Sequence, residues 1–318
     1  MEFETAAFAE LLGRCSAMER LRRKIEQFGP SDLCIHVFGE TGTGKEMVAR
    51  ALHAVSPRAR RQIVPVNVAG IADEMLASEL FGHVRGAFTG AVADREGYVA
   101  EAEGGTLFID EVGDMSPQAQ KGLLRFLEGG EYRRLGENRL RRADVRVITA
   151  TNVDLESRGR EGRFREDLWF RLRDETIELP PLREREGDVI LLARHFLRAQ
   201  AAGRGEAPPT LSREVEAALL GYSWPGNVRQ LLKEMRRLAV CAAGREATLA
   251  DLSSALQDAP PRRAGKLRAV LDEVEAELLQ GALDRNGGVV ARAAAELGIT
   301  RQSLWEKVRR RGLAGASA

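Results

Sequence analysis

The glycine-rich segment that ends in Lys45 carries the clearest chemical signal in this chain. It follows the apolar residues 34–38 and precedes a helical pattern over residues 46–54. Such a turn gathers backbone N–H groups and the positive end of a helix dipole around a phosphate, and a lysine adds a point charge. The pattern predicts a nucleotide-binding P-loop rather than a plain surface turn. Its predicted contact residues are Gly39, Glu40, Thr41, Gly42, Thr43, Gly44, Lys45 and Glu46.

Two acids end a second apolar segment, residues 106–110. Because parallel strands end at one edge of a sheet, we expect Asp110 and Glu111 to emerge beside the P-loop. Asp110 would organise Mg²⁺, and Glu111 would polarise an attacking water. Glu46 stands where Ser or Thr normally offers Mg²⁺ a hydroxyl, so the metal would depend on water and these other carboxylates. Two acids after a strand can also cap a helix, but the nearby P-loop favours the catalytic interpretation.

A third segment combines glycines that allow sharp turns with an aromatic side chain and a hydroxyl. Its residues are Gly86, Ala87, Phe88, Thr89, Gly90 and Ala91. Together with the P-loop, it suggests a loop that nucleotide hydrolysis drives against a partner.

Composition limits the classes of protein to which the chain can belong. With 318 residues, 44% of them hydrophobic and 30% charged, it can bury a sizeable core in two or three domains. No apolar run approaches the ~20 residues of a membrane span, and the acidic start is unlike a secretory signal. We therefore expect a soluble, cytoplasmic protein with no membrane partner. The three cysteines and four histidines lack metal-ligand spacing, and the net charge of +1 neither favours nor excludes nucleic acid.

Strands and helices alternate as far as residue 180. Apolar or β-branched runs predict strands at residues 34–38, 63–67, 106–110, 145–150 and 176–179. The helical patterns between them, such as residues 117–129, indicate an α/β fold with a parallel sheet and helices on both faces. Three further helical patterns predict a lid subdomain, and they lie at residues 189–201, 212–221 and 227–243.

The last part of the chain has the spacing of an all-α helix-turn-helix domain. Residues 267–283 and 290–297 have helical periodicity, and Thr300 can cap a third helix over residues 301–311. Leu304 and Val308 would face the core, leaving other side chains for a DNA groove and for phosphates. The predicted DNA-binding residues are Arg301, Gln302, Ser303, Glu306, Arg309, Arg310 and Arg311. A three-helix packing module without DNA contact is the alternative.

Together these motifs resemble the AAA+ domain of bacterial enhancer-binding proteins, the activators of RNA polymerase that carries sigma-54. The resemblance spans roughly residues 12–243, and two more stretches support it, residues 78–83 and 180–185. The C-terminal part is similar to the Fis-type domain of the same family through residues 293–299 and 301–304. The resemblance implies ATP and Mg²⁺ as cofactors. It implies the sigma-54 polymerase and double-stranded enhancer DNA as partners, and a homo-oligomeric ring that we predict to be a hexamer.

The family pattern also implies roles for single residues. Glutamate normally follows the P-loop lysine in this family, as Glu46 does here. Asn67 resembles the asparagine that restrains the catalytic glutamate and links the nucleotide state to the moving loop. Asn152 resembles the polar sensor beside the γ-phosphate.

Three arginines resemble residues that complete the active site. Arg165 and Arg171 are similar to the arginine fingers that act on a neighbouring subunit, where a permanently charged guanidinium stabilises the transferred phosphoryl group. The alternative is that they are simply solvated or ion-paired, as most arginines in this basic segment should be. Arg229 resembles the sensor arginine of the lid, and Lys233 departs from the family at a position where asparagine is common.

We therefore predict an ATP-dependent transcription activator that binds enhancer DNA and remodels the sigma-54 polymerase. Two alternatives are a DNA-binding regulator that keeps the AAA+ fold without activating sigma-54, and an unfoldase or DNA motor. Residues 86–91 argue against the first, and the helix-turn-helix argues against the second. Only a short segment, with no room for a regulatory domain, precedes the P-loop in this sequence. Either the sequence is a trimmed piece of a longer protein, or its activity is set in trans by another protein or by its own concentration, and we expect control in trans. The predicted segments are 1–12 (N-terminal), 13–182 (α/β), 183–250 (lid), 251–266 (linker) and 267–318 (helix-turn-helix).

Overall fold

The computed structural model describes residues 11–185, 187–257, 279, 281–283, 285–286, 290–300 and 304. The chain divides into two compact units, Met1–Ala259 and Pro260–Ala318. Within the described residues, no helix is long and apolar enough to cross a membrane.

A parallel sheet of five strands forms the centre of the first unit, in the order β2-β3-β6-β1-β7. Its strands are β1 (Ile35–Phe38), β2 (Ile63–Asn67), β3 (Thr106–Asp110), β6 (Arg146–Thr151) and β7 (Glu175–Glu178). The predicted α/β fold is confirmed, and each predicted strand end lies within one residue of the observed end. The strands are short and largely buried, which explains why their apolar runs are visible in the sequence.

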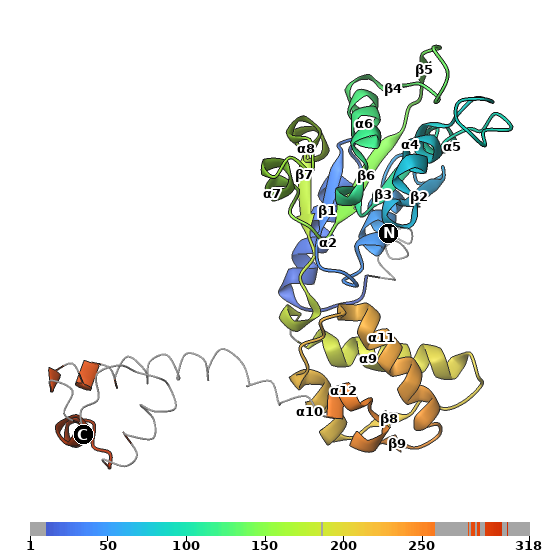
Figure 1. The fold of residues 1–318 in the computed structure, drawn as a ribbon. Helices are drawn as coiled ribbons and strands as arrows, with labels where there is room; N and C mark the ends of the chain where they lie inside the picture. Colours follow the sequence, from blue (N-terminus) through green and yellow to red (C-terminus); the bar gives the residue numbers. More distant parts are fainter. Residues whose placement is uncertain are drawn as a thin grey trace. The chain divides into compact units, whose positions relative to one another are not determined.

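Helices cover both faces of the sheet (Figure 1). On one face, α2 (Ser16–Phe28) and α3 (Lys45–Ala54) share a core with Phe108 of β3. On the other face, a second core joins Ile109 to three helices. These are α4 (Asp73–Phe81), α6 (Pro117–Gly129) and α8 (Glu166–Leu172). Phe108 and Ile109 enter different cores because successive side chains of a strand point to opposite faces.

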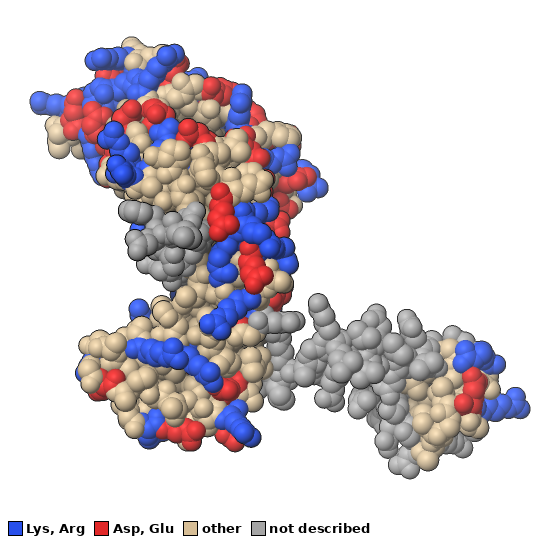
Figure 2. Space-filling model, turned by 180° about the vertical axis from the view of Figure 1, so that it is seen from behind, with Lys and Arg blue, Asp and Glu red and all other residues tan. Residues whose placement is uncertain are grey.

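Shorter elements connect these layers. Two 3-10 turns, η1 (Val68–Gly70) and η2 (Val112–Asp114), follow β2 and β3. The remaining elements of the α/β part are α5 (Tyr98–Glu101), α7 (Leu155–Arg160) and an antiparallel hairpin of β4 (Glu131–Tyr132) and β5 (Arg141–Arg142). Basic and acidic side chains are interspersed over the face of this part that Figure 2 shows.

A helical lid follows the sheet and is connected to it by η3 (Leu182–Glu184). Its core surrounds Trp224, which is fully buried and donates from Nε1 to the Leu219 carbonyl at 2.9 Å. Leu252 and Leu256 join the same core, so the packed structure continues past residue 250, where we predicted the lid to end. Residues 258–266 of the predicted linker lie outside the described residues. The lid elements are α9 (Asp188–Ala202), β8 (Thr210–Leu211), α10 (Arg213–Gly221), α11 (Asn227–Cys241), β9 (Glu246–Ala247), η4 (Leu249–Asp251) and α12 (Ser254–Gln257).

The second unit contains α14 (Val290–Glu296), one helix of the predicted helix-turn-helix. Leu304 is fully buried in a small apolar core with Ala293 and Leu283, which confirms its predicted inward orientation. The predicted DNA contacts, Arg301, Gln302, Ser303, Glu306, Arg309, Arg310 and Arg311, lie outside the described residues.

Arg146, at the start of β6, is a charged side chain that is only 2% exposed. Its guanidinium donates to the carbonyl oxygens of Gly29 at 2.6 Å, Phe28 at 3.0 Å and Leu52 at 3.4 Å. These carbonyls belong to the ends of α2 and α3, where carbonyl groups lack partners within the helix. Arg146 therefore ties both helices to the sheet.

Replacing Arg146 with leucine should lower the free energy of unfolding by roughly 3 kcal/mol, because the carbonyl groups that it serves lose their donor. Urea denaturation measures this change. Arg142→Leu is the matched control: its side chain is 78% exposed and pairs with Glu131, so it should cost less than about 1 kcal/mol. Equal stability of the two variants would show that the helix ends do not depend on Arg146.

Candidate functional site

The P-loop joins β1 to α3 at the carboxyl edge of the sheet. Gly42 and Gly44 have φ angles of 80° and 107°, in the left-handed region that glycine adopts without a Cβ clash. The Gly39 N–H donates to the Thr151 carbonyl at 3.2 Å, which anchors the start of the loop to β6. The loop thus has the turn, the flanking strand and the helix start that a phosphate cradle requires.

Side chains from the ends of different strands converge beside this loop. The Lys45 Nζ is largely buried, donates to the Gly39 carbonyl at 3.0 Å, and lies 3.6 Å from Glu111 Oε1. Glu111 Oε2 accepts from the Asn152 N–H at 3.3 Å. The Asn152 side chain in turn donates to Thr41 Oγ1 at 2.8 Å. The lysine, the acid and the polar sensor predicted from sequence therefore form one connected cluster.

The two acids at the end of β3 stand in unfavourable local environments. Burial raises the pKa of Asp110, and the neighbouring Glu111 charge raises it further against the opposing charge of Lys45. Glu111 has a φ of 56°, in the left-handed region that a non-glycine residue rarely occupies. Such strain costs on the order of 1–3 kcal/mol and is concentrated at functional sites.

The acids at the nucleotide site differ in their fitness to hold a metal. Asp110, half-buried at the strand end, fits the role of a Mg²⁺ ligand or of a partner for metal-bound water. Glu46 does not, because its Oε1 accepts from Arg50 Nη2 at 2.7 Å on the exposed side of α3. In the part of the chain that the structure describes, no group of three His, Cys, Asp or Glu residues could hold a metal alone. A divalent ion here would take its other ligands from phosphate and water.

Asn67 lies beside the acids but does not bond to Glu111. The register of β2 and β3 pairs Asn67 with Asp110. Its Oδ1 accepts from the Ala69 N–H at 3.0 Å and so caps η1. The expected restraint of the glutamate by this asparagine is absent from the hydrogen bonds of the described residues, where Glu111 contacts Asn152 and Lys45 instead.

The lid and its connection contact the P-loop through Arg229, which the sequence analysis selected, and through Asn227 and Arg183, which it did not. The Arg229 N–H donates to the Gly42 carbonyl at 3.2 Å. Asn227, at the start of α11, donates to both Glu40 and Thr41, and Arg183 of η3 forms an ion pair with Glu40. The available signal for Asn227 was its place after Pro225 and Gly226, because asparagine tolerates the positive φ of 50° that it adopts there.

The two candidate arginine fingers lie apart along α8. Arg165, the N-cap of α8, is about half exposed and forms two hydrogen bonds to Asp167. Arg171 is exposed and borders a cavity of about 340 Å³ with Cys34 and Asp174, which precede β1 and β7. This cavity is at the amino edge of the sheet, so Arg171 does not reach the P-loop of its own chain.

Residues 86–91 form a narrow loop whose base is closed by hydrogen bonds. The Gly86 N–H donates to the Ala91 carbonyl at 2.9 Å, and Gly86 and Gly90 have φ angles of 83° and 100°. The Phe88 ring packs edge-to-face on His83, with centroids 5.0 Å apart, whereas Thr89 is exposed. Figure 1 shows the α4–α5 connection, which contains the loop, at the end of the α/β part remote from the lid.

The β4–β5 hairpin supports the base of this loop. The Leu135 N–H donates to the Gly82 carbonyl at 2.9 Å. Arg134 of the hairpin pairs with Glu96, beyond the loop, at 3.1 Å and with Glu137 at 3.1 Å. Hydrogen bonds from Arg141 and Arg134 lower the pKa of Glu137 to about 2. The base of the loop is thus held by backbone and ionic contacts with the β4–β5 hairpin.

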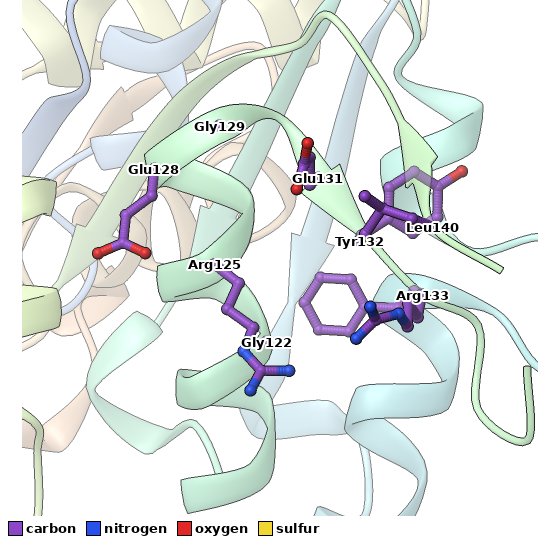
Figure 3. Close-up of a pocket in the computed structure, with 9 residues that line it drawn as sticks. Gly122, Arg125, Glu128, Gly129, Glu131, Tyr132, Arg133 and Leu140 are labelled. Carbon is purple, nitrogen blue, oxygen red and sulfur yellow. The ribbon is translucent and has the colours of Figure 1, made fainter. Parts of the chain in front are cut away.

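A surface cavity of about 490 Å³ lies between α6 and this hairpin (Figure 3). Its rim carries both charges, with Arg125 and Glu128 on α6 and Glu131 and Arg133 on the hairpin side. Mixed charge does not favour a polyphosphate, and the cavity has no glycine-rich helix start. The candidate nucleotide site is therefore the P-loop cluster and not this cavity.

The sequence matches three family models: the Sigma-54 interaction domain over residues 11–178, the AAA+ ATPase lid domain over 183–268, and the Fis family of bacterial regulatory proteins over 270–310. It is 44% identical over 310 residues to the transcriptional regulatory protein ZraR of Klebsiella oxytoca, covering 96% of this chain and 70% of ZraR. It is 42% identical over 330 residues to the DNA-binding transcriptional regulator NtrC of Salmonella typhimurium, covering 96% of this chain and 70% of NtrC.

The structure is similar to crystal structures of NtrX from Brucella abortus. For NtrX in complex with ADP, the TM-score is 0.75 at 34% identity, over 95% of this chain and 70% of NtrX. For NtrX in complex with ATP, the TM-score is 0.75 at 34% identity, over 95% of this chain and 69% of NtrX.

Asp110→Asn should increase the free energy of unfolding at neutral pH by about 1 kcal/mol, measured without nucleotide and metal, because it removes a charge that burial disfavours. A raised folded-state pKa means that the penalty is full above that pKa and is lost as pH falls to the ordinary aspartate range. The difference between variant and wild type should therefore shrink in acid. A variant less stable than wild type at neutral pH would contradict this account.

Proposed function

Because the chain belongs to the AAA+ transcription activators that interact with sigma-54, we propose that ATP hydrolysis at its P-loop drives residues 86–91 against the sigma-54 polymerase. The protein is an ATPase and a transcription activator with a Fis-type DNA-binding domain. The single observation that carries the proposal is the cluster of Lys45, Glu111, Asn152 and Thr41 at one edge of the sheet.

Each member of the cluster has a distinct task in the proposal. The P-loop N–H groups and Lys45 bind the β- and γ-phosphates. Glu111 accepts a hydrogen bond from the water that attacks the γ-phosphate, and Asn152 orients Glu111 through its backbone N–H. A Mg²⁺ ion, held by Asp110 through water, would neutralise charge on the phosphates. Arg229, whose N–H donates to the Gly42 carbonyl from the first turn of α11, would approach the same nucleotide.

Completion of this site requires a second subunit in the proposal. Arg165 and Arg171 are exposed on α8, and Arg171 lies at the sheet edge opposite its own P-loop. In the proposal, Arg165 or Arg171 of a neighbouring subunit therefore stabilises the phosphoryl group. We propose a homo-oligomeric ring, with a hexamer as the expected size. Ring assembly would make activity depend on protein concentration or on a regulatory protein acting in trans.

The moving loop and the DNA-binding domain supply the specificity of the proposed activator. Asn67 and α4 connect the acid end of β3 to the base of residues 86–91, with Thr89 exposed for contact with sigma-54. Arg301, Gln302, Ser303 and Glu306 would contact the major groove of enhancer DNA in the cytoplasm, and Arg309, Arg310 and Arg311 would contact phosphates. A DNA-binding regulator that does not activate sigma-54 is the alternative, and its loop would be expendable.

Lys45→Ala should abolish ATP binding, whereas Glu111→Gln should retain binding and lose hydrolysis by about 100-fold or more, because only the second change spares the phosphate cradle. Binding of a fluorescent ATP analogue and phosphate release measure the two effects. Near-normal turnover by Glu111→Gln would remove this residue from the proposed chemistry.

Mixing Arg165→Ala or Arg171→Ala with Glu111→Gln should restore part of the hydrolysis that each lacks alone. Some mixed interfaces then pair an intact acid with an intact arginine. Phosphate release over a series of mixing ratios tests this, with light scattering to confirm assembly. Assembled mixtures without any recovered activity would argue against action in trans.

Thr89→Ala should leave ATP hydrolysis within about twofold of wild type and abolish sigma-54-dependent transcription, because the side chain is exposed and distant from the P-loop. Transcription from a sigma-54 promoter and phosphate release are measured on the same preparation. Retained transcription would favour the alternative in which the loop is expendable.

A further inference from the structure

Glu40, the second residue of the P-loop, has its carboxylate engaged by groups outside the loop. Arg183 donates from Nη2 to Oε1 at 2.6 Å and from Nη1 to Oε2 at 2.9 Å. The Asn227 Nδ2 donates to Oε2 at 3.1 Å. The first partner lies in η3, between sheet and lid, and the second begins the lid helix α11. The same carboxylate therefore links three segments that are distant in the sequence.

Asn227 is the second centre of this junction. Its side chain is fully buried. Besides Glu40, its Nδ2 donates to the Thr41 carbonyl at 3.1 Å, and its Oδ1 accepts from the Leu182 N–H at 2.8 Å. The amide thus uses both its donor and its acceptor group, which fixes its orientation. Because Asn227 also holds a positive φ of 50°, the start of α11 is positioned by these contacts and not by an ordinary helix cap.

The lid backbone also contacts Gly42, the P-loop residue that follows Thr41. A Cβ atom on Gly42 would lie only 2.4 Å from the Gly226 carbonyl oxygen. The Arg229 N–H donates to the Gly42 carbonyl at 3.2 Å. Contacts of α11 and its N-cap therefore reach three successive P-loop residues, and the backbone position of Arg229 depends on them.

We propose that Glu40 is a positioning residue that clamps the lid onto the P-loop and tunes nucleotide affinity through Arg229, not through phosphate contact. The inference rests on the proposed function, in which Arg229 approaches the nucleotide. An unpaired carboxylate beside a polyphosphate would repel it. The pairing with Arg183 compensates the charge of Glu40, so the carboxylate can hold the lid without repelling the nucleotide phosphates.

Glu40→Gln in the full chain tests the clamp, because an amide cannot accept both Arg183 donors and turns an NH₂ group toward one of them. The dissociation constant for fluorescently labelled ADP should rise about tenfold, the effect of losing one charge-assisted hydrogen bond. Arg183→Lys should act in the same direction, since it keeps the charge and loses the two-pronged geometry.

A double-variant cycle separates action through the lid from direct action on phosphate. Asn227→Asp places a second carboxylate against Glu40 and should weaken binding. Adding Glu40→Gln places an amide NH₂ donor at position 40, opposite the new carboxylate at position 227. The double variant should therefore bind ADP more tightly than Asn227→Asp alone. Glu184→Gln is the matched control: Glu184 is 62% exposed and 3.8 Å from Arg183, so binding should match wild type. Thermal unfolding checks that every variant is folded.

The outcomes distinguish the clamp from the proposed nucleotide site. Wild-type affinity in folded Glu40→Gln, with binding lost in Lys45→Ala, would overturn the clamp and leave the proposed function intact. Strictly additive effects of the Glu40 and Asn227 changes would also overturn it, because the two residues would then act independently. Full binding by Lys45→Ala would instead overturn the nucleotide site itself.

Discussion

The parallel pairing of β1 with β6 and β7 is the constraint on which the functional geometry depends. The register places Phe38 beside Thr151 of β6 and Glu178 of β7, so three strands end at one edge. β3 joins the same edge through its pairing with β6. The P-loop, the two acids and Asn152 follow these ends, which brings residues more than 100 positions apart into hydrogen-bonding distance. An antiparallel arrangement would send them to opposite edges.

The residues at this edge of the sheet lower the stability of the fold. Asp110 is partly removed from water, and Glu111 holds a left-handed backbone. Elsewhere the structure is conventional: two apolar layers sandwich the sheet, and Arg146 satisfies the ends of two helices. The rigid layers offset the strain at the strand ends, which is where a functional site needs unusual conformations and charges.

The nucleotide cluster and the partner loop lie at different ends of the α/β part, and rigid elements join them. α4 begins six residues after Asn67 and ends at Phe81, next to the glycine whose carbonyl anchors the β4–β5 hairpin. A shift at the end of β3 or β2 can therefore reach the loop as a movement of α4. The lid contacts the P-loop through Asn227 and Arg229. The nucleotide site is thus connected through packed elements both to residues 86–91 and to the lid.

The sequence by itself determined the P-loop, the paired acids and the five strands, because glycine spacing, terminal acids and apolar runs are local features. The assignment of residues 86–91 as the loop that contacts sigma-54 depended on the resemblance to a family. Only the tertiary structure decided that Arg183 and Asn227 hold Glu40 from 143 and 187 positions away. The Asn67 cap of η1 and the Glu46–Arg50 pair are local contacts, joining residues two and four positions apart, but tertiary packing decided that Leu256 belongs to the lid core. A side chain's partner depends on which elements pack together, and no local pattern specifies that packing.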